Sequence, residues 1–211
     1  MKAHALVTHS IRRTQEERWS ESNRRMLDAA IRLIANQGIA KTTLALVGEE
    51  AGYSRGLASH RFGTKSELLV AVVKDIQDRF ATTYLLPGVE NYQGVEAVLK
   101  AIDIYFDTFS KDVITTRAFY VLLTSSLTET EESAMLSVKA NERFREFFEG
   151  LIGNIDLERD GVSDVDPSAQ ARLIVGMLRG VTLEWLIDPD PVDLQQVGKN
   201  ARQVLQTALS W

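Results

Sequence analysis

Apolar residues recur at intervals of three and four along most of the chain, the spacing that places them on one face of an α-helix. No segment alternates apolar and polar residues between turn signals at hairpin spacing. The pattern therefore predicts an all-α fold. The first predicted helix begins near Ser20 or Ser22 and ends at Gly38 as a C-cap, and its apolar stripe consists of Leu27, Ala30, Ile31 and Ile34.

Two short helices are predicted next. One begins at Thr42 or Thr43, whose hydroxyl can cap exposed amides, and runs to about Ala51. The other is capped by Ser54 and ends near Phe62. A glycine follows each of them, which favours a turn at both positions.

A long fourth helix is predicted from the capping box formed by Thr64 and Glu67. It is expected to end at Pro87-Gly88, because this pair breaks helices. Asp166-Pro167-Ser168 is a further helix start. The remaining helical periods cover residues 92–110, 113–128, 132–155, 166–187 and 192–209.

Composition is that of a folded soluble protein, with 45% hydrophobic and 25% charged residues. The chain has no cysteine, which excludes disulfides, thiolate metal sites and a cysteine nucleophile. Its apolar runs are too short to span a bilayer, and no secretion signal follows the start. We therefore expect a cytoplasmic protein that has no membrane partner.

Common catalytic motifs are also missing. The chain has no G-x-G-x-x-G, P-loop, H-E-x-x-H or G-x-S-x-G pattern. Its three histidines, His4, His9 and His60, are poorly placed for a metal cluster or a catalytic triad. We expect no enzyme, no catalytic residue, no metal and no cofactor.

Charge is unevenly distributed along the chain. Residues 1–65 hold 11 Lys and Arg against 6 Asp and Glu, a net charge of +5 within the overall −5. The remainder holds 13 basic and 23 acidic residues, a net charge of −10. A basic module on an acidic body is what a protein needs if only one end is to meet phosphates.

The segment 43–62 has the pattern of a helix-turn-helix, in which a supporting helix packs across a recognition helix. A close crossing favours small residues, and Gly48 and Ala51 provide them. Gly48 is unfavourable inside a helix by about 1 kcal/mol relative to alanine, so a packing role is expected.

The residues from Thr42 to Leu69 carry an ordered series of motifs without a gap. In order these are Thr42-Thr43, Ala51-Gly52, Ser54-Arg55-Gly56, His60, Phe62-Gly63-Thr64-Lys65 and Glu67-Leu68-Leu69. The series resembles the TetR (tetracycline repressor) family of transcriptional regulators. Ala58 and Ser59 stand where that family commonly has leucine and tyrosine, so the phosphate contact of that tyrosine is not implied here.

Binding to double-stranded DNA is the function that this segment predicts. Arg55 is the best candidate for reading bases, because a guanidinium can bond guanine O6 and N7 together. Gly56 would allow close backbone approach, and a basic arm containing Arg12, Arg13 and Arg18 could reach a minor groove. The candidate DNA-binding residues are Thr42, Thr43, Ser54, Arg55, Gly56, Ser59, His60, Arg61 and Lys65.

The resemblance also implies an effector cavity in the larger helical part of the chain. The expected domains are a flexible arm over 1–19, a helix-turn-helix domain over 20–66 and an effector-binding and dimerisation domain over 67–211. The effector is a small molecule that the sequence does not identify. Aromatic residues here, such as Phe119, Phe144 and Phe147, are mostly expected in the core, and the candidate pocket residues are Tyr105, Phe109, Arg117, Tyr120, Asn141 and Arg145.

Dimerisation through the last two helices is a further implication of the resemblance. The candidate interface consists of Leu173, Gly176, Met177, Gly180, Val197, Ala201, Val204 and Leu205. Helical periodicity alone is equally consistent with packing into the chain's own core. A homodimer would bind a palindromic operator, because two-fold symmetry places the same helix on both half-sites.

These features favour a ligand-released repressor over two alternatives. A helical adaptor that binds another protein would lack sequence-specific DNA binding, and an enzyme would require turnover of a substrate. Repression and activation stay open, because the position of the operator, rather than the protein's DNA contacts, separates them.

Overall fold

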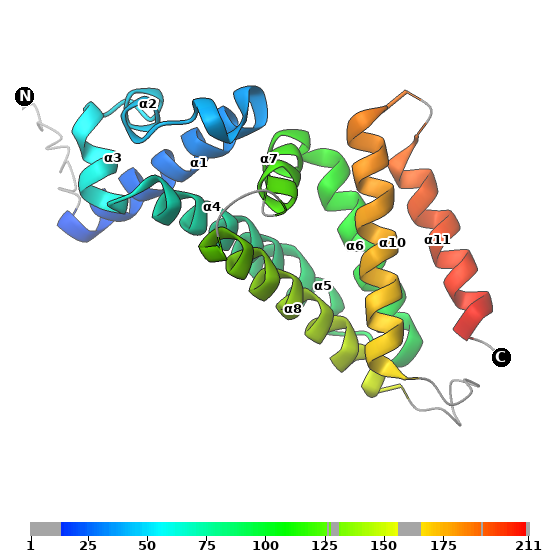
Figure 1. Cartoon of the computed structure of the whole chain (residues 1–211). Helices are drawn as coiled ribbons and strands as arrows, with labels where there is room; N and C mark the ends of the chain where they lie inside the picture. Colours follow the sequence, from blue (N-terminus) through cyan, green and yellow to red (C-terminus); the bar gives the residue numbers. More distant parts are fainter. Residues whose placement is uncertain (1–13, 126, 128–130, 156–165, 191, 210–211) are drawn as a thin grey trace, which may run out of the picture.

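The computed structural model describes residues 14–125, 127, 131–155, 166–190 and 192–209, and the regular secondary structure in these ranges is entirely helical. The predicted all-α fold is confirmed. At one end of the molecule lie α1 (Gln15–Lys41), α2 (Leu44–Glu50) and α3 (Arg55–Phe62), and at the other lie α10 (Pro167–Ile187) and α11 (Leu194–Leu209) (Figure 1). The elements between them are α4 (Lys65–Arg79), the π-helix η1 (Phe80–Leu85), α5 (Leu86–Val89), α6 (Gly94–Lys111), α7 (Val113–Ser125) and α8 (Glu131–Gly153).

Helix α1 begins earlier than its apolar stripe suggested. Thr14 and Glu17 form a capping box, with the Glu17 amide donating to Thr14 Oγ1 at 3.1 Å and the Thr14 amide donating to Glu17 Oε2 at 2.7 Å. The predicted start at Ser20 is therefore wrong by more than a turn, and helix occupies the last part of the expected arm. Arg12 and Arg13 lie outside the described residues.

The predicted end of α1 at Gly38 is only partly right. Gly38 has φ 79°, in the left-handed region that favours glycine, so the helix kinks there. One more turn continues to Lys41 before the chain leaves for α2.

The fourth helix begins as predicted, since both bonds of the capping box of Thr64 and Glu67 are present. Hydrogen bonds from the hydroxyl and the amide of Thr64 lower the pKa of the Glu67 carboxyl. The helix does not stay regular to its end, because η1 follows Arg79 without a break and leads into α5, which contains Pro87. Such π segments are rare and often lie at functional sites.

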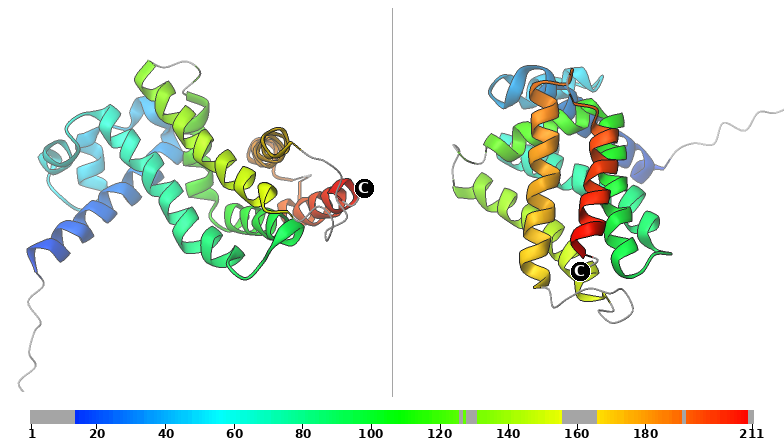
Figure 2. Two further views of the ribbon diagram at one scale, coloured as in Figure 1. Left: turned by 90° about the horizontal axis from the view of Figure 1, so that it is seen from below. Right: turned by 90° about the vertical axis from the view of Figure 1, so that its right-hand side faces the viewer.

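One hydrophobic core runs through the molecule from α1 to α10. Met26 and Ile34 of α1, Phe106 of α6, Phe148 of α8 and Leu178 of α10 are almost completely buried in it. Helix α1 packs mainly on α7, α10 on α8, and α11 on α6. Helices α10 and α11 run side by side at the end away from α1–α3 (Figure 2). Their main contacts are not with each other, because α10 packs mainly on α8 and α11 mainly on α6.

Within the described ranges no helix has both the length and the apolar character needed to cross a bilayer.

The packing of α2 on the segment before α3 generates a first prediction. A Cβ at Gly48 would lie 2.6 Å from the backbone oxygen of Ser54, too close for any side chain. We expect Gly48→Ala to destabilise the protein by about 1–3 kcal/mol, because overpacking outweighs the gain in helix propensity. The free energy of unfolding in urea measures the effect.

Gly150→Ala is the matched control. Gly150 lies in α8, and a Cβ there would meet no atom within 4 Å. The same exchange should therefore stabilise the protein by about 0.5–1 kcal/mol. Equal effects of the two substitutions would contradict the close contact.

Candidate nucleic-acid interface and internal cavity

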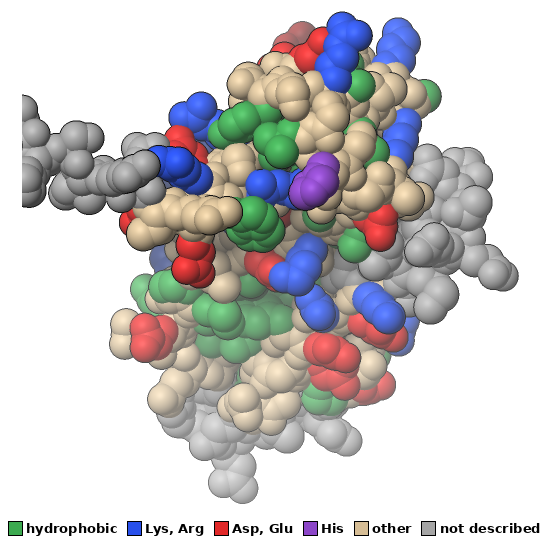
Figure 3. Space-filling model, turned by 90° about the vertical axis from the view of Figure 1, so that its left-hand side faces the viewer, with side chains coloured by type: hydrophobic (Ala, Val, Ile, Leu, Met, Phe, Trp, Pro, Cys, Tyr) green, Lys and Arg blue, Asp and Glu red, His purple; other side chains and the backbone are tan. Residues whose placement is uncertain are grey.

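Helix α3 presents a polar, solvent-exposed face at the end of the molecule. Ser54, Arg55, Gly56, Ser59 and His60 are all exposed. Figure 3 shows this end, with Lys and Arg side chains around the single histidine of the described ranges. The opposite side of α3 packs inward through Ala58, which is completely buried. The helix therefore has one face for packing and one face free for a partner.

Arg55 is the most exposed cation of α3 that the sequence singled out. Its side chain retains 76% of its accessible surface, and it pairs with the carboxylate of Glu49 in α2. An exposed pair of this kind contributes about 0–1 kcal/mol to stability, so the guanidinium can exchange Glu49 for another anion or a base with little loss of free energy.

Arg61 is held by the protein itself. Its guanidinium donates to the carbonyl of Trp19 and to Oγ of Ser22, both at 2.9 Å, and lies 4.6 Å from the centre of the Trp19 ring. Desolvation lowers the pKa of Arg61, although Tyr53 acts in the opposite direction. Arg61 thus fastens α3 to α1 through two of its N–H donors and a cation–π contact.

Lys65 and Thr42 also make internal contacts. The ammonium of Lys65 donates to the carbonyls of Ile39 at 2.6 Å and Ala40 at 3.3 Å, at the end of α1. Thr42 is completely buried, and its hydroxyl donates to the Gly38 carbonyl at 2.9 Å. The predicted DNA contact of Thr42 is therefore wrong, because its side chain is not accessible.

Thr43 differs from its neighbour because it is exposed. Its hydroxyl caps α2 by accepting a hydrogen bond from the Leu46 amide at 3.2 Å. Ser54 occupies the N-cap position of α3, as predicted, but its side chain makes no capping hydrogen bond. The two hydroxyls lie at the N-termini of the two helices, where backbone amides favour anions.

A cavity of about 140 Å³ lies inside the larger part of the molecule. Its walls come from the end of α4, η1, α5, α6, α7, α8 and α10, and they are mostly apolar and aromatic. The lining consists of Ile76, Gln77, Asp78, Phe80, Ala81, Leu85, Leu86, Tyr105, Phe109, Phe119, Arg143, Phe144, Phe147 and Arg179.

Two of the six predicted pocket residues, Tyr105 and Phe109, line this cavity. The other four, Arg117, Tyr120, Asn141 and Arg145, lie outside this lining. Arg117 is exposed on α7, because its neighbours Thr116 and Ala118 take the inward positions.

Tyr120 is buried behind Tyr105, and their hydroxyls are 2.9 Å apart. The Tyr120 hydroxyl donates to the Arg179 carbonyl at 3.2 Å. Desolvation raises the pKa of both phenols, so they stay protonated at neutral pH. Asn141 and Arg145 of α8 are partly buried outside the lining, and Oδ1 of Asn141 has no hydrogen-bond partner among the described residues.

Helices α10 and α11 leave apolar side chains in solvent. Leu173 and Ile187 of α10 are 68% and 76% exposed, and Val204 of α11 is 64% exposed. Gly176 and Gly180 are exposed on α10 as well. These side chains form an apolar surface that the described part of the chain leaves uncovered.

The predicted interface residues on α11 are divided between this surface and the core. Ala201 is only 8% exposed in the single chain, where α11 packs mainly on α6, so its side chain belongs to the core. Val197 and Leu205 are partly buried, as is Met177 of α10.

Residues 26–72 match the family model described as bacterial regulatory proteins, tetR family. Along most of its length the chain is similar to the HTH-type transcriptional regulator TtgR of Pseudomonas putida, with 24% identity over 189 residues, which are 87% of this chain and 89% of TtgR. Residues 26–72 therefore form a DNA-binding domain of the tetR family. The helix-turn-helix lies within this match, and the resemblance found in the sequence is confirmed.

Solved structures agree with the observed fold. A tetR-family transcriptional regulator from Rhodococcus sp. superimposes with a TM-score of 0.78 at 21% identity, covering 90% of this chain and all of that one. The SmeT–triclosan complex superimposes with a TM-score of 0.74 at 23% identity, covering 89% of this chain and 90% of SmeT.

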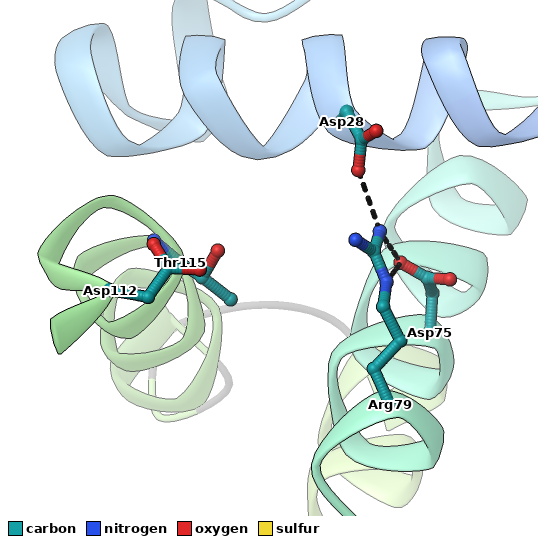
Figure 4. A network of polar contacts seen from close by, with 5 residues as sticks. All are labelled: Asp28, Asp75, Arg79, Asp112 and Thr115. Carbon is teal, nitrogen blue, oxygen red and sulfur yellow. Dashed lines mark hydrogen bonds and ion pairs between the residues drawn. The ribbon is translucent and has the colours of Figure 1, made fainter. Parts of the chain in front are cut away.

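One ion pair of the regulator joins the cavity-lining helix to the DNA-binding domain. Arg79, at the end of α4, donates to Asp28 Oδ1 of α1 at 2.8 Å and also pairs with Asp75 (Figure 4). Desolvation opposes the charge of Arg79, but these hydrogen bonds outweigh it and raise its pKa. The N-terminus of α7, where Asp112 accepts from the Thr115 amide at 3.1 Å, lies across from this pair (Figure 4).

The sequence did not single out most of the cavity residues. Phe119, Phe144 and Phe147 were expected only as aromatic residues of the core, and Ile76 and Phe80 were not singled out. Arg179 was not singled out either, and only the tertiary structure brings it to the cavity wall.

The contrast between Arg61 and Arg55 generates a second prediction. Arg61→Ala should lower the free energy of unfolding by about 1–3 kcal/mol, because it removes two charged hydrogen bonds and a cation–π contact. Arg55→Ala should change it by less than about 1 kcal/mol, since its ion pair is exposed. Chemical denaturation of both variants checks this, and a larger loss in Arg55→Ala would contradict the assignment.

Proposed function

We propose that this regulator is a homodimeric repressor that releases a palindromic operator when a small molecule enters its cavity. One observation carries the proposal. The helix formed by α4 and η1 supplies Ile76 and Phe80 to the cavity wall, while Arg79, between them, pairs with Asp28 of the DNA-binding domain. Movement of this helix on ligand binding would therefore be transmitted to α1.

The mechanism is a two-state equilibrium. A ligand that binds better to one arrangement of α4 favours that arrangement, and its binding energy sets how far the equilibrium shifts. Displacement of α4 moves α1 through the Arg79–Asp28 pair, and α3 follows because Arg61 fastens it to α1. In a dimer this changes the distance between the two recognition helices and weakens binding to both half-sites.

DNA recognition is assigned to the exposed face of α3 and the N-terminus of α2. Arg55 reads a base edge in the major groove, and His60 lies on the same exposed face. Thr43, Ser54 and Ser59 donate to phosphates and set the register. Gly56 allows close approach, since there is open space where a Cβ would stand.

Arg61 and Lys65 take a different role from the one their sequence positions suggested. Their donors are used by the carbonyls of Trp19 and Ile39, so they hold α3 and α4 against α1. Both still contribute positive charge to the surface that meets the phosphates.

Dimerisation is assigned to the apolar surface of α10 and α11. Leu173, Ile187 and Val204 are exposed, and the exposed glycines of α10 permit close helix approach. A symmetric dimer through this surface would place two α3 helices on half-sites about 34–36 Å apart, or a multiple of that distance.

A role for a small molecule is supported by the apolar cavity and by the SmeT structure, in which a protein of the same fold is in complex with triclosan. The effector-binding and dimerisation domain is thus assigned to residues 67–211, and the helix-turn-helix domain to residues 20–66.

Selection of bound duplexes from a random DNA pool tests the DNA-binding part. The purified protein should enrich a palindrome, and Arg55→Ala should lose discrimination at one position in each half-site, a loss of about 1–3 kcal/mol per contact. Lys100→Ala is the matched control, because it removes one positive charge from α6, away from α3. Absence of a palindromic consensus would overturn the proposal.

Repression is tested by transcription in vitro from a promoter that contains the selected operator between its recognition elements. Addition of the protein should reduce transcript yield, and Arg55→Ala should not. An increase in yield would show an activator instead.

The dimer is tested by sedimentation of Leu173→Glu and Val204→Glu. Both side chains are exposed in the single chain, so these substitutions leave its fold intact but place charges in the proposed interface. We expect a shift from dimer to monomer, with DNA affinity reduced at least tenfold. Leu127→Glu changes a residue that is 84% exposed outside α10 and α11, and it should remain dimeric.

A further inference from the structure

We infer that the cavity accepts a small aromatic carboxylate, whose anionic group pairs with Arg179 and whose ring packs against the aromatic lining that includes Phe80, Tyr105 and Phe144. The inference rests on the proposed function for its regulatory meaning, because it names the chemical class of the molecule that would release the operator. Its physical basis is the combination of a cation that no described carboxylate neutralises with a small cavity lined by aromatic rings.

Arg179 is a cation in a mostly apolar wall. Its side chain is partly buried, and no ion pair joins it to a carboxylate of the described residues. Arg79 and Arg202, which are also partly buried, each pair with two carboxylates. Buried charges are normally paired, so the guanidinium of Arg179 favours an anion brought by a ligand.

The surroundings of Arg179 further favour an anionic ligand, because they disfavour its unpaired charge. Burial lowers its pKa, and the charge of Arg145 acts in the same direction, while the phenols of Tyr105 and Tyr120 only partly oppose them. Within the described residues its ring contact is Phe144, whose centre lies 5.8 Å from the guanidinium carbon. A cation–π contact is weaker than a bidentate bond between a guanidinium and a carboxylate.

Two other charged residues line the cavity. The carboxylate of Asp78 is paired with Lys74 on the same helix, so it is already neutralised. Arg143 is exposed and adds a second guanidinium to the lining. The charges around the cavity therefore favour an anionic ligand over a cationic one.

The aromatic side chains determine the shape of the body that the ligand carries. Tyr105 stacks on Phe109 with 4.3 Å between ring centres and on Phe144 with 5.7 Å, and Phe80 meets Tyr105 edge-on. These rings contact one another and together line part of the cavity, so a flat ring in the cavity would gain further offset-stacked or edge contacts against the cluster.

The volume of the cavity is close to the space that one ring needs. An apolar protein cavity of about 150 Å³ holds a benzene molecule, and the volume here is about 140 Å³. An inorganic anion would leave the aromatic wall unfilled. A single-ring carboxylate satisfies both the charge and the space.

Calorimetric titration of the full-length protein, without DNA, tests the inference with benzoate and its neutral counterpart benzamide. We expect benzoate to bind at one site per chain and at least tenfold more tightly than benzamide. Acetate, which carries the charge without the ring, should not bind. Absence of benzoate binding, or equal affinity for benzoate and benzamide, would overturn the inference without any variant being needed.

Arg179→Gln then identifies the anchor. It should weaken benzoate binding at least tenfold and remove the preference over benzamide. Arg172→Gln makes the same exchange two turns earlier on α10 at an exposed residue outside the lining, and it should leave both affinities unchanged. Retention of the benzoate preference in a folded Arg179→Gln protein would exclude Arg179.

The operator complex separates this inference from the proposed function. Release of the selected duplex by benzoate supports both. Binding of benzoate in calorimetry without release of the duplex supports the ligand class and overturns ligand-released repression by it. If the protein does not bind benzoate but a neutral compound releases the duplex, ligand-released repression is supported. The assignment of the ligand as an aromatic carboxylate is then overturned.

Discussion

The pairing of Arg79 with Asp28 is the contact on which the proposed regulation depends. It joins the helix that lines the cavity to the first helix of the DNA-binding domain. Arg79 is also bound by Asp75 of its own helix, so its guanidinium pairs with a carboxylate of each of the two helices. The π-helix that begins at the next residue shifts the helical register where the wall of the cavity forms.

Basic residues of the DNA-binding end serve two purposes that their sequence positions do not separate. Arg61 and Lys65 use their donors on carbonyls of α1, so they orient the recognition helix. Arg55 stays exposed and forms a weak surface pair with Glu49. A rigidly positioned helix with a freely available guanidinium suits the reading of base edges, since the protein does not have to reorganise on binding.

Apolar side chains are likewise divided between the core of the chain and the surfaces that would contact the proposed partners. Helix α11 buries Leu194 and Ala201 against its own subunit and leaves Val204 in solvent, while α10 leaves Leu173 and Ile187 exposed. The inner aromatic cluster surrounds a cavity instead of closing completely. The poorly neutralised Arg179 of that cavity gives it a preference in charge, which hydrophobic packing alone would not supply.

The sequence by itself determined the elements whose causes are local. The capping box of Thr64 and Glu67, the small residue Gly48 and the helix-turn-helix spacing were all predictable, because residues three or four apart meet within one helix. The box of Thr14 and Glu17 has the same signature and was the signal for the true start of α1. Burial of Thr42, the internal role of Arg61 and the approach of Arg179 to the aromatic rings were decided only by the tertiary structure. Each depends on how its helix packs on the elements around it, and helical periodicity carries no information on which helices meet.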